Sequence, residues 1–557
     1  MRSNFFIVIG LAGFLLGSCK KNNTGTVKPP DTSAHDFVMS SYALDDVEGQ
    51  ANYVNTSRQP KLSFRFTNKL DRTTVAASFL MYDGNGNKVA LLASYKNSDS
   101  IVLLQPANSL THLNKYSLQL TDALKAADGG KLLNSTSFNI ITGIDSADKY
   151  SRISDDALLD LVQSQTLKYF WDFGHPVSGL ARERNTSGDI VTTGGSGFGI
   201  MAMISGMHRN FITRSEGLSR VQKIVSFLQN KAQRFHGAYP HWLNGATGVV
   251  QPFSTKDNGA DLVETSYLMM GLLSARQYFN GVAPEETVLR DTINMIYDAV
   301  EWDFFRKNNS DVLYWHWSPT YSWDMNLPLR GWNECLITYI MAASSKTHGI
   351  PKSVYDVGWA QNGAIKTPAT LYGYAMPFAT NYGGPLFFSH YTFTGIDPRG
   401  LSDAYGNYQT QVTNHSLINF EYAKANPKKY FGYSASCWGL TASDIPNGYA
   451  ACSPANDLGV IAPTAALSSF PYTPTQSMQA LKFYYYTIGD KLFKNYGFID
   501  AFSLSQVWFA DSFLAIDQGP IIVMIENYRS GLLWQLFTSC PEVKTGMRSL
   551  GFSASYL

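Results

Sequence analysis

The sequence predicts a mainly α-helical protein in which a toroid of paired helices follows a small all-β sandwich. The first observation behind this prediction is a change of hydrophobic period, from two residues before about residue 145 to helical spacing after residue 155. The second is that roughly 400 residues carry helical patterns without alternating strands, which favours an α/α toroid over a parallel α/β barrel. The third is length, because 557 residues are enough for more than one domain.

The composition is that of a folded, globular protein. Hydrophobic residues make up 45% of the chain and charged residues 16%, which excludes a disordered chain or a coiled coil. The net charge of +1 provides no field that would attract nucleic acid, so we expect no nucleic-acid partner. Aromatic residues reach 14%. Because flat rings suit sugar faces as well as protein cores, carbohydrate is a candidate ligand.

The N-terminus has the pattern of a bacterial lipoprotein signal. A basic start leads into an apolar run over Phe5–Leu16, which is too short to span a membrane. The run ends in Leu-Gly-Ser-Cys, so we expect residues 1–19 to be a signal peptide with lipidation at Cys19. Residues 20–35 would form a flexible tether. These features predict an exported lipoprotein of the outer membrane, on either its periplasmic or its external face.

Four further cysteines remain after Cys19. Cys437 and Cys452 bracket a loop rich in Gly, Pro and Asn, and the sequence leaves open whether they form a disulfide in an oxidising compartment. No spacing among the cysteines resembles a zinc site. We therefore expect no metal and no cofactor.

Residues 36–145 have the pattern of half-buried strands. Leu62, Phe64 and Phe66 alternate with polar residues, and turn signals such as the one at residues 83–86 recur between short apolar runs. About seven strands over about 105 residues predict an immunoglobulin-like sandwich. We expect this domain to act as a spacer or support, with independent glycan binding as the alternative.

Residues 150–557 should form the helical domain. Helical spacing is strongest over 197–209, 216–233, 260–279, 284–306, 333–345, 474–487 and 519–538. The intervening loops, such as 308–332 and 372–408, are long and dense in Gly, Pro, Tyr and Trp. Long loops at one end of a toroid are expected to build the functional site.

Two groups of acids are candidates for the chemistry of that site. Asp257 lies in a loop before a predicted helix, and Asp261 and Glu264 are three residues apart and so share a helix face. Acids in a first helical turn also serve as caps and complement the helix dipole, which is the simpler interpretation. Three of them at one helix end exceed what capping requires.

Glu334 and Asp517 form the second group. Glu334 opens a helix just after a Trp-rich loop that includes Trp323 and Trp332. A carboxyl group under indole rings is desolvated, which raises its pKa and suits it to donate a proton. Asp517 stands between an apolar run and a helix start, where a lone Asp is more often a cap than a base.

Four motifs together identify a family resemblance. Gly194–Gly199, Asp257–Glu264, Arg330–Glu334 and Ile516–Pro520 resemble, in this order, glycoside hydrolase family 144, the glycoamylase-like β-1,2-glucanases. The resemblance covers about residues 150–557. It implies an (α/α)6 barrel, an inverting mechanism and a β-1,2-glucan substrate. The glycine run follows no strand of a βαβ unit, so close packing at a helix start explains it better than dinucleotide binding.

The resemblance also implies roles for the acids. Glu334 and Asp517 match the family's other site acids, and the motif itself does not divide the roles. Desolvation favours Glu334 as the proton donor, which leaves Asp517 as our choice for the base. The expected substrate-binding residues are Asp257, Asp261, Glu264, Trp323 and Trp332. We expect a monomeric enzyme that releases short oligosaccharides such as sophorose, and the sequence does not distinguish internal from chain-end cleavage.

Other functions share this fold class. α/α toroids also include polysaccharide lyases and sugar epimerases, which need His, Tyr, Arg or a metal. His241, His390 and His415 are isolated in sequence, so we expect them to be hydrogen-bonded structural residues. A non-catalytic glycan-binding lipoprotein, and an enzyme for α-glucans such as starch, are the remaining alternatives.

Overall fold

The computed structural model describes residues 35–557, which fall into two compact units. The first runs up to Leu110 and includes Lys115–Ile140; the second comprises Thr111–Asn114 and Ile141–Leu557. The expected signal peptide, the lipidated Cys19 and the tether up to residue 34 lie outside the described residues.

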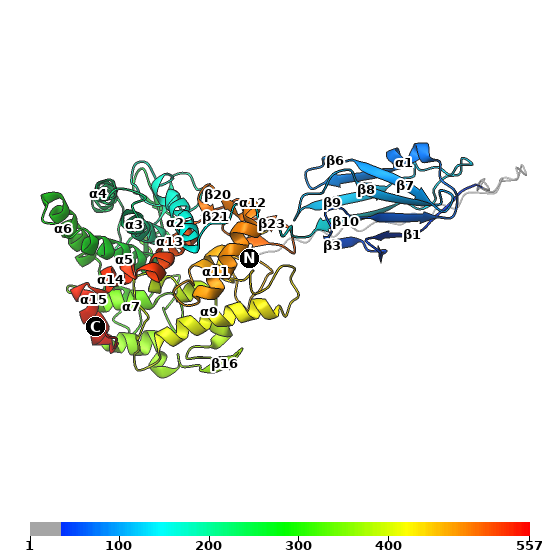
Figure 1. Ribbon diagram of the computed structural model, residues 1–557. Helices are drawn as coiled ribbons and strands as arrows, with labels where there is room; N and C mark the ends of the chain where they lie inside the picture. The colour runs from blue at the N-terminus through cyan, green and yellow to red at the C-terminus, as the bar shows by residue number, and fades with distance from the viewer. Residues whose placement is uncertain (1–34) are drawn as a thin grey trace, which may run out of the picture. The chain divides into compact units, whose positions relative to one another are not determined.

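The first unit is a sandwich of two five-stranded sheets (Figure 1). In sheet order, one contains β2 (Val47–Glu48), β1 (Met39–Leu44), β4 (Leu62–Phe66), β8 (Ile101–Pro106) and β7 (Leu91–Lys96). The other contains β3 (Asn52–Thr56), β10 (Thr136–Thr142), β9 (Lys115–Leu120), β5 (Phe79–Asp83) and β6 (Lys88–Val89). A short helix, α1 (Arg72–Ser78), precedes β5.

The predicted immunoglobulin-like sandwich is confirmed. Leu62, Phe64 and Phe66 are buried in its core, while Ser63 and Arg65 between them are not. In the antiparallel register, Phe64 lies opposite Tyr42 on one side and Val102 on the other. The ten strands exceed the predicted seven in part because β2 and β6 have only two residues each, too few to show an alternating pattern.

The second unit is built from helices (Figure 1). They are α2 (Asp155–Trp171), α3 (Thr193–His208), α4 (Arg214–Asn230), α5 (Leu262–Tyr278), α6 (Pro284–Asp298), α7 (Leu336–Ser344), α8 (Lys352–Val354), α9 (Tyr408–Ala425), α10 (Pro463–Leu467), α11 (Pro474–Lys482), α12 (Gly489–Leu492), α13 (Ala515–Arg529), α14 (Leu532–Thr538) and α15 (Pro541–Leu550).

Short antiparallel ladders decorate the helices. They pair β11 (Ile190–Thr192), β12 (Trp242–Asn244) and β13 (Val250–Gln251); β14 (Ala260–Asp261) and β15 (His316–Trp317); β16 (Ala369–Leu371) and β17 (Tyr374–Met376); β18 (Ala442–Ile445) and β19 (Gly448–Ala451); β20 (Phe493–Lys494) and β21 (Gly497–Phe498); and β22 (Phe502–Ser503) and β23 (Trp508–Phe509). None of these ladders makes a parallel sheet, in agreement with the predicted absence of βαβ units.

The helices form an inner and an outer layer. From Thr193 to Met207 every residue of α3 is buried, and α5 is buried over most of its length, because both are apolar around the whole circumference. The outer helix α6 instead buries one face, which includes Leu289 and Ile293, and exposes the other. α3 packs between α13 and α5, and α5 also packs against α7. The mainly α-helical barrel is confirmed.

A segment of 3-10 turns over Leu386–Thr394 closes the inner layer between α7 and α10. Thr392 Oγ1 accepts a hydrogen bond from Ile337 N of α7, at 3.2 Å. His390 Nε2 is 3.0 Å from Ser469 Oγ, two residues after α10. α10 in turn packs against α13. The inner layer is therefore a continuous ring.

The glycine run predicted to serve close packing does so between α3 and α5. A Cβ added at Gly197 would lie 2.2 Å from the carbonyl oxygen of Tyr267, and one at Gly271 would lie 2.3 Å from that of Gly197. The two backbones thus touch, and only glycine fits at these positions.

Some helix boundaries differ from the prediction. The helix expected over 284–306 ends at Asp298 and is followed by a separate 3-10 turn, Trp302–Arg306. The helix expected over 519–538 is two helices, broken where Gly531 adopts a φ of 71°. The helix α9 was not predicted from the sequence.

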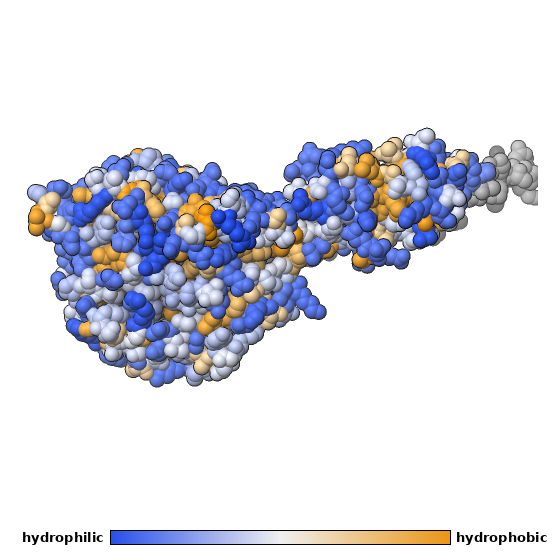
Figure 2. All heavy atoms as spheres, in the orientation of Figure 1, coloured by the Kyte–Doolittle hydropathy of each residue, from blue (hydrophilic) through white to orange (hydrophobic). Residues whose placement is uncertain are grey.

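The four cysteines of the helical unit are buried free thiols, so the disulfide between Cys437 and Cys452 that the sequence left open is not formed. Within residues 35–557, no helix has the length and apolarity to cross a lipid bilayer. The face shown in Figure 2 is largely hydrophilic, with separate small apolar areas.

Candidate active site

The candidate acids gather at the N-terminal ends of inner helices. Asp261 is the N-cap of α5, Glu264 lies in its first turn, Glu334 comes two residues before α7, and Asp517 lies in the first turn of α13. Free backbone N–H groups and the helix dipole make such ends favourable for negative charge. The Tyr391 hydroxyl is within the electrostatic reach of Asp517, Glu334 and Glu264 together. The acids therefore surround one region.

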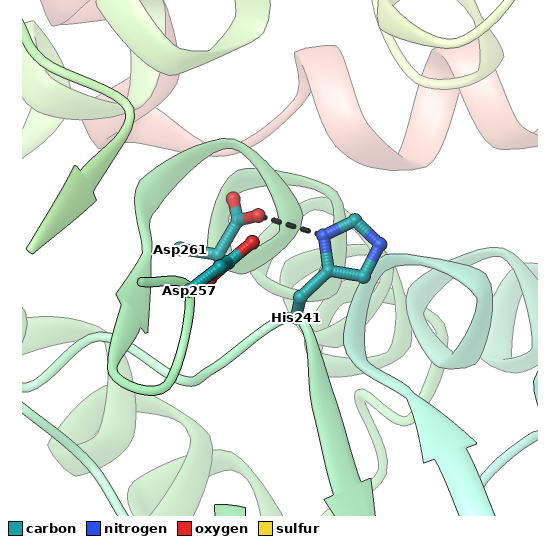
Figure 3. A group of neighbouring side chains, drawn as sticks. All are labelled: His241, Asp257 and Asp261. Atoms are coloured by element: carbon teal, nitrogen blue, oxygen red, sulfur yellow. Dashed lines mark hydrogen bonds and ion pairs between the residues drawn. The ribbon is translucent and has the colours of Figure 1, made fainter. Parts of the chain in front are cut away.

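Asp261 is fully buried and makes two kinds of contact. Its Oδ1 accepts hydrogen bonds from the N–H groups of Val263, at 3.0 Å, and Glu264, at 2.9 Å. Its Oδ2 lies 2.9 Å from His241 Nδ1 (Figure 3). Burial by itself raises the pKa of Asp261, but the hydrogen bond and the positive charge of His241 hold it below its usual value. Asp261 is therefore ionised.

Two histidines, His241 and His316, contact the carboxyl groups of this cluster. Burial lowers the pKa of His241, but the charges of Glu264, Asp261 and Asp257 outweigh it and raise that pKa to about 9. His316 reaches the cluster because β15 pairs with β14, placing it opposite Asp261. Its Nε2 is 3.4 Å from Asp257 Oδ2, and burial lowers its pKa. At neutral pH, His241 is thus the imidazolium of the site.

Within this cluster, Asp257 is harder to ionise than Asp261. It is 4% exposed, and its Oδ1 has no hydrogen-bond partner among the described residues. Burial and the neighbouring charge of Asp261 raise its pKa to about 7, against the opposing effect of His241. Asp257 and Asp261 therefore form a pair with one fixed negative charge and one proton that is exchangeable near neutral pH.

Glu264 is bound to the start of α3. Its Oε2 accepts from the N–H of Gly194 at 2.7 Å and from Thr192 Oγ1 at 3.3 Å. A Cβ on Gly194 would stand only 2.7 Å from this oxygen, so glycine permits the approach. Burial raises the pKa of Glu264. These hydrogen bonds link the first turn of α5 to the start of α3.

The Glu334 side chain is partly exposed, and its backbone carbonyl group is fixed by hydrogen bonds from two other segments of the inner layer. Its carbonyl oxygen accepts from Thr392 Oγ1 at 2.7 Å and from the Tyr267 hydroxyl at 3.3 Å. Desolvation, followed by the charges of Asp261 and Glu264, raises the pKa of its side chain to about 7. A backbone hydrogen bond lowers this pKa but does not outweigh burial, so Glu334 retains a proton into the neutral range, as expected of a general acid.

The two tryptophans assigned to substrate binding lie in different environments. Trp332 packs against Phe378 and Phe393, and its Nε1 donates to Gly383 O at 3.0 Å. Trp323 packs instead against Phe304 and Tyr314, with ring centroids 5.3 and 5.9 Å away. The contacts of Trp323 anchor it to the 3-10 turn Trp302–Arg306, and they do not place it over Glu334 as the sequence analysis expected.

Asp517 lies in a second acidic cluster. It is 1% exposed, and its carboxyl group contacts that of Asp500, which is 2% exposed. Asp500 Oδ2 accepts from Asp444 N at 2.7 Å, and the carboxylate of Asp444 pairs with Arg184 at 3.2 Å. Burial and then Asp500 raise the pKa of Asp517 well above its usual value.

A cavity of about 500 Å³ opens beside this second cluster. Arg184 and Asp444 line it together with Tyr449, Trp508 and Phe509, the latter on the β19 and β23 strands. Tyr449 is 50% exposed although its hydroxyl lies within the field of Asp517 and Asp444. Flat aromatic faces beside charged hydrogen-bonding groups are suited to a sugar ring.

One group of residues has the spacing to hold a metal ion. Single ligand atoms of His241, Asp257 and Asp261 lie within 4.8 Å of one another (Figure 3). A metal ion here would have to displace the proton that the neighbouring carboxylates stabilise on His241, because an imidazolium has no lone pair to offer. The contact of His241 with Asp261 balances the carboxylate charge.

Sequence reasoning missed three members of the site. His241 was assigned to structure, whereas it contacts Asp261, and neither His316 nor Asp500 was proposed. The sequence around each of them gives little indication of a role in the site, because a ladder or loop places each one beside a partner from another segment. By contrast, His390 and His415 are buried and hydrogen-bonded, as expected.

Comparison with known proteins links this site to a family. The glycoamylase family model matches residues 326–541, and the bacterial Ig-like domain model matches residues 44–140. The solved endo-β-1,2-glucanase of Chitinophaga pinensis, a complex with sophorotriose and glucose, is 54% identical, with a TM-score of 0.71. The match covers 73% of this chain and the whole of the Chitinophaga chain.

Two proteins of Parabacteroides distasonis are also similar. A crystal structure of a β-1,2-glucanase is 36% identical with a TM-score of 0.70, and the match covers 94% of this chain and 74% of that one. An exo-β-1,2-glucooligosaccharide sophorohydrolase acting at the non-reducing end is 45% identical over 421 residues, 72% of this chain. The match spans 58% of the length of that curated relative.

An (α/α)6 barrel with carboxyl groups collected at the N-terminal ends of its inner helices is a scaffold of carbohydrate-active enzymes, and the similar solved proteins above are β-1,2-glucanases. Given the extent of its similarity to the Chitinophaga enzyme, the chain belongs to the glycoamylase-like family, glycoside hydrolase family 144.

Proposed function

We propose that the protein hydrolyses β-1,2-glucan and releases short oligosaccharides that include sophorose. The observation that carries the proposal is the 54% identity to an endo-β-1,2-glucanase over the whole of that solved chain. The carboxyl groups with raised pKa values at the N-terminal ends of the inner helices also support it. The similar proteins include both an endo-acting and an exo-acting enzyme, so identity alone does not choose the cleavage pattern.

In the proposed mechanism Glu334 and Asp517 divide the work of inversion. Glu334 donates its proton to the leaving glycosidic oxygen, and its pKa of about 7 keeps it protonated up to neutral pH. Asp517, directly or through a water, takes a proton from the attacking water on the opposite sugar face. Asp257, Asp261 and Glu264 hold sugar hydroxyls and set the local charge.

Product analysis tests the proposal. The purified protein is incubated with linear β-1,2-glucan, laminarin, cellulose and starch, and the products are separated by thin-layer chromatography. We expect sophorose and related oligosaccharides from β-1,2-glucan alone, with no effect of a chelator. Activity confined to starch, or loss of activity with chelator, would contradict it. A product ladder at early times would indicate internal cleavage, and sophorose alone would indicate chain-end cleavage.

The alternative of a non-catalytic glycan-binding protein is separated by two variants. Glu334→Gln and Asp517→Asn should each lose turnover by about two to four orders of magnitude, the usual contribution of one acid or base. Binding of β-1,2-glucan should persist in both. Wild-type binding without any turnover would favour the binding protein.

We also propose that the enzyme is an exported monomer held at the outer membrane by lipid on Cys19. The proposal rests on the apolar run and the Leu-Gly-Ser-Cys sequence at its end. Fractionation of cells, with protease treatment of intact cells, would distinguish the periplasmic from the external face. Light scattering of the lipid-free protein tests the monomer.

A further inference from the structure

Asp500 is buried beside the proposed base but has no role in the mechanism above. It lies in the turn between β21 and β22, and its N–H donates to Ser512 O at 3.0 Å. Its Oδ2 accepts from Asp444 N at 2.7 Å. Both backbone and side chain are thus fixed, with the carboxyl group directed to Asp517 of α13.

Three of the four oxygens in this pair of carboxyl groups receive no hydrogen bond from any other described residue. Neither oxygen of Asp517, nor Oδ1 of Asp500, receives a hydrogen bond from an N–H or O–H of the described residues. Two buried carboxylates in contact repel each other and cannot both stay ionised. A proton must therefore lie between them.

The groups around the pair do not remove this repulsion. Arg184 is the positive side chain in reach, and it is already paired with Glu183 at 3.0 Å and with Asp444 at 3.2 Å. The remaining groups that face the pair, Asp444, Tyr391 and Tyr449, are negative or neutral. The surroundings thus favour a pair with one shared proton and one negative charge.

We propose that Asp500 is a positioning residue that shares one proton with Asp517 and sets the pH range in which Asp517 acts as base. The inference rests on the proposed function. In the reaction, Asp517 receives a proton from water as the hydroxide adds to the anomeric carbon, while Glu334 gives its proton to the leaving oxygen. The pair then holds two protons, and one passes to solvent as Glu334 is reprotonated.

Asp500→Asn tests the proposal because the amide is nearly isosteric. Its oxygen can still accept from Asp444 N, and its NH2 group can donate to Asp517. In the acidic limb the pair gains its second proton, and in that step Asp500 is a neutral O–H donor to the Asp517 carboxylate, which the asparagine replaces by a weaker N–H donor. The Asp517 carboxylate is therefore stabilised less in the variant, and we expect the acidic limb of kcat against pH to move up by about half a unit or more. The alkaline limb, assigned to Glu334, should stay in place.

A matched control and the contradicting result are available in the same experiment. Asp156→Asn makes the same charge change at an exposed position in the first turn of α2 and should leave both limbs unchanged. An Asp500→Asn enzyme that is active with an unmoved acidic limb would overturn the proposal while the proposed function stands. Wild-type protein inactive on β-1,2-glucan would overturn the proposed function instead.

Thermal unfolding tests the shared proton without turnover. A carboxyl whose pKa is raised by folding contributes stability below its unfolded pKa, and this is lost as pH rises through its folded pKa. Wild-type Tm should therefore fall between about pH 4 and pH 8 relative to Asp500→Asn and, as a second variant, Asp517→Asn. Parallel Tm curves for the wild type and whichever variant folds would overturn the proposal.

Discussion

Replacement of Glu334 by glutamine removes an acid that keeps its proton into the neutral range mainly because burial raises its pKa. Burial raises the pKa of Glu334 from 4.5 to about 7. At pH 7 a glutamic acid with the lower value would be protonated in about 0.3% of molecules, whereas Glu334 is protonated in about half. The environment thus raises the proton-donating population roughly 150-fold at pH 7.

The assay measures kcat on β-1,2-glucan from pH 5 to pH 9 for wild type and Glu334→Gln. The amide keeps the shape of the side chain but cannot donate a proton, so turnover should fall by about two to four orders of magnitude. The wild-type rate should decline above about pH 7, where Glu334 loses its proton. The residual rate of the variant should lack this decline.

A second substrate makes the test specific to proton donation. An aryl β-sophoroside has a leaving group that departs without protonation, so the deficit of Glu334→Gln should be much smaller on it. Glu285→Gln, an exposed change on α6, is the charge-matched control and should behave as wild type. Near-normal turnover by Glu334→Gln would refute the reasoning. Asp257, whose pKa is also about 7, would then be the next acid to test.

The remaining predictions concern the substrate cavity, the domain boundary and the anchor. Trp508→Ala should raise KM for long β-1,2-gluco-oligosaccharides by about tenfold with little change for the shortest cleaved substrate, because Trp508 lines the cavity beside Asp517. Initial rates are measured against chain length, and an equal rise in KM for short and long substrates would show that this is wrong. A truncated protein starting near Asp148 should retain hydrolysis, as the Chitinophaga chain corresponds to only 73% of this one; a folded but inactive truncation would show that the sandwich contributes to the site. Cys19→Ala should leave the protein soluble or uncleaved, and an unchanged membrane fraction would exclude lipidation there.

The fold was predictable where hydrophobic pattern follows burial. Leu62, Phe64 and Phe66 show the strand period because one face of the sheet is buried. Helix α9 was missed because polar residues occupy its buried face. Gln411 bonds the backbone of Phe378 and Asn419 bonds that of Leu440, so burial here is satisfied by hydrogen bonds that no hydropathy period reveals.

The site was predictable to the extent that its residues are neighbours in sequence. Asp257, Asp261 and Glu264 stand in one helix-opening segment, so their proximity follows from helix geometry. His316 joins them only through the β14–β15 ladder, 55 residues after Asp261 along the chain. Such a two-residue ladder has no pattern of its own. The proximity of His316 to Asp257 and Asp261 was therefore invisible before the structure.

The two sides of the site differ in how their charge is balanced, and this difference bears on the transition state. Asp261 stays ionised because His241 and two backbone N–H groups stabilise its negative charge. For Glu334, burial outweighs a backbone hydrogen bond that lowers its pKa, and the group stays protonated into the neutral range. Hydrolysis develops positive charge on the sugar ring as the leaving oxygen takes a proton. A fixed carboxylate near a neutral acid suits both changes at once, because the first stabilises the oxocarbenium-like ring and the second supplies the proton.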